Sequence, residues 1–152
     1  AFVSARGGYR PVRNQGERAR VSLQRLATQP SGKWVPRPFS LSGCNIGQQD
    51  AWLQSWNADP QLLLDLSVGA DHLPKRLLFG FELDWESQLG ASQLFLDLGW
   101  GFGKQLRREL EVEKGENLFL IEPSKPVLKL RLDPTDDNAK FRVRNLRLLQ
   151  EG

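Results

Sequence analysis

The sequence has one cysteine, one histidine and no methionine in 152 residues. Because Cys44 is the only cysteine, the chain cannot form an internal disulfide or a multi-thiolate metal site. Because His72 is the only histidine, a two-histidine metal site within one chain is also excluded. No apolar run reaches the roughly 18 residues of a membrane span, and no N-terminal stretch resembles a signal sequence. The start at Ala1 without methionine indicates a piece of a longer protein. We therefore expect a cytoplasmic location, with any membrane association coming from the parent protein.

Basic residues are concentrated near the N-terminus. Residues 1–38 carry seven arginines and one lysine against the single acid Glu17, whereas the remainder holds 13 basic and 17 acidic residues. Glycine and proline recur through the same segment and interrupt any long helix or strand, so only residues 18–27 could form a short element. We therefore predict a basic, irregular leader or linker over residues 1–33 and a β-sandwich domain over residues 34–152.

The leader has two interpretations that the residues leave open. Spread arginines suit nucleic-acid phosphates or anionic lipid, because each cation near a polyanion releases counterions. A solvated linker, or a strap across the acidic domain, is the simpler interpretation. No aromatic residue lies between Tyr9 and Trp34 for a base to stack on. A nucleic-acid or membrane partner would therefore depend on the arginines alone.

Apolar and polar residues alternate through most of the chain after Trp34, as in strands with one buried face. This alternation predicts eight strands, at residues 51–56, 61–67, 76–85, 92–98, 105–113, 117–121, 127–132 and 141–149. The inward positions predict a shared core of Phe79, Phe81, Leu83, Leu94, Leu96, Leu128, Leu130 and Val143. In the last strand the phase slips by one residue near Arg144 and Asn145, which predicts a β-bulge.

Regularly spaced short strands with polar outer faces indicate an all-β fold with little helix. An antiparallel β-sandwich accounts for the pattern, and a jelly roll is the best single topology. A lipocalin-like barrel is the main rival, because it closes its edges completely.

Four ordered stretches resemble the β-sandwich accessory region beside the catalytic domains of some bacterial polysaccharide and lipopolysaccharide glycosyltransferases. They are Asp59-Pro60-Gln61, residues 93–99, Gly101-Phe102-Gly103 and residues 130–134. The resemblance covers roughly residues 50–150. It implies a non-catalytic, carbohydrate-associated module whose partner is a glycan or a nucleotide-sugar enzyme domain of the same chain.

The candidate sugar-binding residues lie in and after a glycine-rich turn. Trp100 has Gly99 and Gly101 on either side, and glycines allow a ligand to approach the backbone closely. Indole stacks on the C–H faces of sugars. Gln105 and Arg107 are the nearest polar partners for sugar hydroxyls. The alternative is that Trp100 folds back and caps the end of the sandwich.

The other tryptophans favour structural roles. Trp85 is in phase with the apolar residues of its strand, so we expect it in the core. Trp52 and Trp56 lie four residues apart and form either part of the core or a binding platform, with the core favoured.

Three carboxylates follow the strand at 127–132. Asp133, Asp136 and Asp137 supply hard oxygen ligands that could hold calcium, although the EF-hand glycine and distal glutamate are missing. Asp and Asn beside proline also form turns unaided. We expect no other cofactor.

No residue pattern supports catalysis. Asp84 and Glu86 merely share a solvent face in a strand, and His72 has no partner motif for a nucleophile. The leading hypothesis is therefore a carbohydrate-binding module accessory to a glycosyltransferase that makes cell-surface glycans. The alternative is a structural domain for protein–protein contacts or homo-oligomerisation, with the leader as a docking segment.

Overall fold

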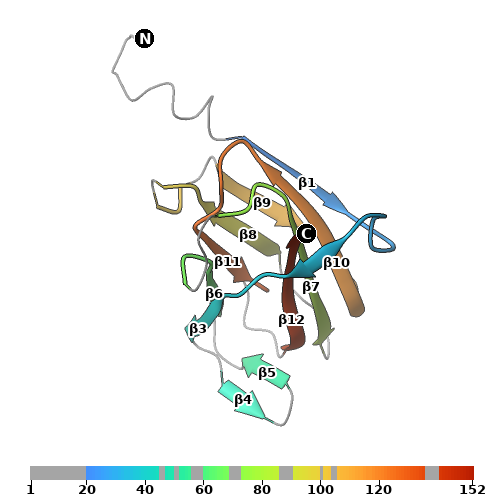
Figure 1. The fold of residues 1–152 in the computed structure, drawn as a ribbon. Helices are drawn as coiled ribbons and strands as arrows, with labels where there is room; N and C mark the ends of the chain where they lie inside the picture. The colour runs from blue at the N-terminus through green and yellow to red at the C-terminus, as the bar shows by residue number, and fades with distance from the viewer. Residues whose placement is uncertain are drawn as a thin grey trace.

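The computed structural model describes residues 20–44, 47–49, 52–55, 60–68, 73–85, 91–99, 101–103, 106–135 and 141–152. Within these ranges the regular secondary structure is β-strand, and the strands form two antiparallel sheets (Figure 1). The strands are β1 Val21–Arg25, β2 Trp34–Pro36, β3 Ser40–Cys44, β4 Gly47–Gln49, β5 Trp52–Ser55, β6 Gln61–Asp65, β7 Leu77–Trp85, β8 Ser92–Asp97, β9 Arg107–Leu110, β10 Gly115–Pro123, β11 Lys129–Asp133 and β12 Phe141–Glu151. Among the described residues, no helix is long and apolar enough to cross a membrane.

The pairing of β5 to β12 is nested, which confirms the jelly roll. In the seven-stranded sheet the order is β1-β10-β7-β12-β5-β4, with β2 paired to β12, and in the five-stranded sheet it is β3-β6-β11-β8-β9. The first of these eight strands therefore pairs with the last, the second with the second last and the third with the third last, while β8 and β9 form the innermost pair. This is a long hairpin rolled into two sheets, and the eight strands coincide with the eight predicted ones.

The core between the sheets is built by strand alternation. In β6, in β8 and in β11 up to Leu132, every second residue is buried, because successive side chains point to opposite faces of a sheet. Seven of the eight predicted core residues are buried: Phe79, Phe81, Leu83, Leu94, Leu96, Leu130 and Val143. Phe81 contacts Phe79 and Phe119, with ring centroids 5.2 and 6.1 Å apart.

Leu128 is the exception to the predicted core. It precedes β11, at a bend where its backbone N–H donates to the Asp97 carbonyl, and its side chain is only half-buried. Val127 is fully buried in its place. The alternation therefore begins two residues later than predicted, at Lys129.

The predicted bulge is present in β12. Arg144 is opposite Glu82 and Arg147 is opposite Gly80, so two residues of β12 face one residue of β7. Asn145 takes the left-handed conformation at φ 57°, which asparagine tolerates better than most residues. The bulge lets both halves of β12 place their apolar residues inward.

The domain includes part of the segment predicted as leader. β1 pairs with β10 along its whole length, from Val21 opposite Pro123 to Arg25 opposite Phe119. Leu23 packs against the core. The sandwich therefore begins before residue 34, and the described part of the predicted leader is not irregular throughout. Residues 1–19 lie outside the described residues.

Candidate functional site

The outer face of the five-stranded sheet carries one row of mixed apolar and polar side chains. Across the sheet, the register aligns Ser42 with Leu63, Leu63 with Arg131, Arg131 with Phe95 and Phe95 with Arg107. These five residues come from the five strands of the sheet, so the row runs perpendicular to the strands. The row therefore brings together five residues that are far apart in the sequence.

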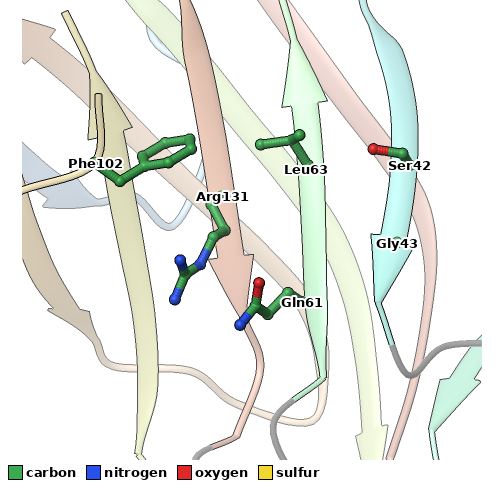
Figure 2. A pocket seen from close by; sticks show the side chains of 6 residues that line it. All are labelled: Ser42, Gly43, Gln61, Leu63, Phe102 and Arg131. Carbon is green, nitrogen blue, oxygen red and sulfur yellow. The ribbon is translucent and has the colours of Figure 1, made fainter. Parts of the chain in front are cut away.

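A hollow of ≈ 320 Å³ lies on this face. It is lined by Ser42, Gly43, Gln61, Leu63, Phe102 and Arg131 (Figure 2). Figure 2 shows the Phe102 ring and the Leu63 side chain near one end, with the Gln61 amide and the Arg131 guanidinium toward the other. The hollow thus combines an apolar surface with a hydroxyl, an amide and a cation.

Arg131 is fixed in the hollow by a bidentate ion pair. Its Nε and Nη2 donate to the two carboxylate oxygens of Asp133, each at 2.9 Å. The Asp133 side chain is 9% exposed and that of Arg131 26% exposed. The guanidinium carbon lies 4.2 Å from the centre of the Phe95 ring and 6.0 Å from that of Phe102. Both fork geometry and aromatic contacts hold the guanidinium plane in place.

A carboxylate organises the loop that brings Phe102 to the hollow. Asp97 Oδ1 accepts hydrogen bonds from the backbone N–H groups of Gly99 at 2.8 Å and Gly101 at 2.9 Å. Both glycines have positive φ, 119° and 82°, where a Cβ would be strained. The turn therefore depends on these glycines and Asp97, and it directs Phe102 back over the sheet.

The structure describes only one of the three predicted sugar-binding residues. Trp100 and Gln105 lie outside the described residues. Arg107 is exposed on β9, directly opposite Phe95, so it lies on the same outer face as the hollow without lining it. Its role in binding stays a prediction.

Sequence reasoning missed most of the residues that line the hollow. Phe102 lies in the same glycine-rich turn as Trp100, and this position in the turn is the sequence feature that could have identified it. Ser42, Gln61 and Arg131 are far apart in the sequence. Only the pairing of β3, β6 and β11 brings them together.

The calcium prediction rests largely on residues outside the described ranges. Asp136 and Asp137 are among them, while Asp133 uses both carboxylate oxygens on Arg131. Within the described ranges, no group of three or more His, Cys, Asp or Glu side chains could hold a metal ion. A cation at Asp133 would have to compete with the guanidinium.

Cross-strand ion pairs occupy part of the outer face of the seven-stranded sheet. Arg142 pairs with Asp84 at 2.9 Å, Arg144 with Glu82 at 3.0 Å and Arg147 with Glu116 at 2.6 Å. The hydrogen bond from Arg142 lowers the pKa of the Asp84 carboxyl below its ordinary value. This face thus presents cross-strand charge pairs.

Trp52 belongs to this charged face. Its ring centre lies 4.6 Å from the Arg142 guanidinium carbon and 4.3 Å from that of Arg144, and the side chain is half-buried. Trp52 is therefore neither a core residue nor an open binding platform, because two guanidinium groups stack on its indole. Trp85 packs partly against the core, as predicted, with Lys114 Nζ 5.4 Å from its ring centre. Trp56 lies outside the described residues.

Comparison with known proteins finds similarity at the level of structure. No family model and no curated protein matches the sequence. A family 29 carbohydrate-binding module solved with mannohexaose has a TM-score of 0.48 at 12% identity, covering 87% of this chain and 94% of that chain. Another structure of a family 29 carbohydrate-binding module has a TM-score of 0.46 at 12% identity, covering 87% and 90%. The enzymatically active domain of bacteriophage CBA120 tailspike protein 4 has a TM-score of 0.37 at 10% identity, covering 84% and 19%.

Proposed function

We propose that the outer face of the five-stranded sheet binds carbohydrate through the hollow at Phe102 and Arg131. The observation that carries the proposal is the composition of this hollow, in which an aromatic ring and Leu63 lie beside the polar groups of Ser42, Gln61 and Arg131. Sugars need both kinds of surface, because their C–H faces pack on apolar groups while their hydroxyls need donors and acceptors. On the outer face of the other sheet, by contrast, Arg142, Arg144 and Arg147 form cross-strand ion pairs with Asp84, Glu82 and Glu116.

The rigidity of the hollow supports the same function. Arg131 is held by Asp133, and the Phe102 loop by Asp97, so little side-chain freedom would be lost when a ligand is ordered there. The hollow extends from β3 across β6 to β11. An extended glycan would therefore lie across the strands, with one ring against Phe102 and hydroxyls near Gln61 and Ser42.

The wider role proposed for this module is accessory. The resemblance at residues 50–150 supports attachment to a bacterial glycosyltransferase that makes cell-surface glycans, with the module binding the glycan or orienting the catalytic domain. Binding of this kind needs no catalytic residue.

Calorimetric titration with soluble oligosaccharides of bacterial surface polysaccharides tests the proposal. Phe102→Ala should weaken binding about ten-fold, since loss of one stacking ring removes on the order of 1–2 kcal/mol. Trp52→Ala is the matched control, because it removes a half-buried aromatic from the opposite face and should leave affinity unchanged. Trp100→Ala tests the sequence prediction for the glycine-rich turn in the same assay.

Three results would discard the proposed hollow. They are no binding of any oligosaccharide by the folded wild type, equal binding by wild type and Phe102→Ala, or a loss seen equally with Trp52→Ala. Circular dichroism and the melting temperature of each variant separate lost binding from lost folding.

A further inference from the structure

β3 forms an edge of the five-stranded sheet that is open to solvent. It pairs with β6 on one side, and no other described strand pairs with it. Residues 40–43 are all exposed, and Leu41 is 43% exposed. A strand edge of this kind leaves backbone N–H and C=O groups available for pairing with another chain.

This edge lacks the devices that usually block such pairing. Proteins protect strand edges with charged residues, proline, bulges or very short strands. The opposite edge of the same sheet, β9, has three charged residues among its four, and β4, at an edge of the other sheet, has only three residues. β3 has five residues, Ser-Leu-Ser-Gly-Cys, without charge or proline.

We infer that β3 pairs antiparallel with the β3 of a second copy of this chain. In a two-fold interface the central residue of the strand faces its own copy and the other residues lie near theirs, so a charge on β3 would lie close to a like charge. The uncharged sequence removes that repulsion. The other edge of the sheet, with Arg107, Arg108 and Glu109, would bring like charges together.

The sequence of β3 also selects one register. Inward-facing residues must meet inward-facing residues, because a slip by one position would turn side chains to the wrong face. The register centred on Ser42 satisfies this condition and pairs all five residues. It places Leu41 of each copy opposite Gly43 of the other, where the missing side chain leaves room for the exposed leucine.

Pairing at β3 would join the two candidate hollows. Ser42 and Gly43 line the hollow and lie on the edge itself. Two five-stranded sheets would become one ten-stranded sheet, with the two hollows on the same face and adjacent across the symmetry axis. The dimer itself does not depend on carbohydrate binding, and its test requires no sugar.

Sedimentation of the full chain over a range of concentrations tests the dimer. The wild type should show a monomer–dimer equilibrium with a dissociation constant in the micromolar range, up to about 100 μM. Leu41→Lys places a cation on each copy near the axis and should weaken association at least ten-fold. Glu109→Lys is the matched control at the β9 edge and should leave the equilibrium unchanged. A wild type that remains monomeric at about 1 mM would overturn the inference.

Cross-linking identifies the register. In a Cys44→Ser background, Ser42→Cys places the two new thiols directly opposite each other, at a separation from which a disulfide can form. Mild oxidation should convert this variant to a covalent dimer, whereas Glu109→Cys in the same background should remain monomeric. A dimer insensitive to Leu41→Lys and not cross-linked through Ser42→Cys forms elsewhere, and that result also overturns the inference.

Discussion

The two outer faces of the sandwich differ in how their outward-pointing side chains are arranged. Both are made of alternating strands around one core, yet the seven-stranded face is filled while the five-stranded face is hollowed. At one end of the seven-stranded face, Leu78, Leu118 and Leu120 are covered by Leu26, Trp34 and Leu149, and further along it the arginines of β12 pair with acids of β7 and β10. The topology therefore does not decide which face can bind a ligand; the outward residues do.

The arginine–aspartate pairs show the difference most clearly. Arg142 and Asp84 have side chains 46% and 41% exposed, whereas those of Arg131 and Asp133 are 26% and 9% exposed. Exposed pairs contribute little because water screens them. The Arg131 pair is bidentate and partly desolvated, so it holds a side chain in a defined place beside the hollow.

The largest effect should come from the core that both faces share. Phe81→Ala removes a ring 1% exposed and should lower the free energy of unfolding by about 3–5 kcal/mol, through lost burial and a residual cavity. Urea denaturation measures this change. Phe102→Ala is the matched control, since Phe102 lies outside the core, and it should cost much less. Similar losses would mean that Phe102 is part of the structural core and would weaken the contrast between core and site.

A smaller effect should separate the two ion pairs. Asp133→Asn should lower the free energy of unfolding by about 1.5–3 kcal/mol, because it leaves a partly buried guanidinium without its carboxylate. Asp84→Asn removes the exposed counterpart and should cost about 0.2–1 kcal/mol. Equal losses in the same denaturation assay would contradict the distinction between the faces. Only Asp133→Asn should also weaken oligosaccharide binding.

The smallest effect concerns the packing of Arg147 on Gly80. A Cβ at Gly80 would lie 2.6 Å from the guanidinium carbon of Arg147, which pairs with Glu116, so Gly80→Ala must shift this guanidinium. Without Arg147, alanine should be favoured over glycine in the strand by about 0.5–1 kcal/mol. In the wild-type background the shift of Arg147 should cancel that gain, so a double-mutant cycle with Arg147→Ala should show coupling of at least about 0.5–1 kcal/mol. The same effect of Gly80→Ala in both backgrounds would show that the guanidinium does not rest on the glycine.

The sequence predicted the fold well where alternation was long. β5 to β12, the jelly roll and the bulge at Asn145 all follow from the spacing of apolar residues, and the structure confirms them. Of the four earlier strands, β1 lies within residues 18–27, the one stretch of the predicted leader for which a short element was expected. β2, β3 and β4 were missed because they are short and lie among glycines and prolines. β1 and β2 also pair with partners about a hundred residues away, as Val21 with Pro123 and Pro36 with Leu149 show, and local patterning does not contain that information.

The candidate site could be predicted only in part. The glycine-rich turn was recognised as a place for a binding aromatic, and Phe102 belongs to it. Ser42 and Gln61 carry no local signal, because a serine or glutamine on an outward strand position is ordinary. Arg131 faces outward in the predicted strand, as observed. Its bidentate contact with Asp133 could not be predicted, because the predicted strand ended at residue 132 whereas β11 includes Asp133.

Chemical-shift mapping by NMR during an oligosaccharide titration tests the central claim most directly, because it reports on both faces in one experiment. If the five-stranded face binds sugar, the amides of Gln61, Leu63, Phe102 and Arg131 should shift in a saturable way, while those of Glu82, Arg142 and Arg144 should not. Saturable shifts centred on the charged seven-stranded face, with none around the hollow, would contradict the account.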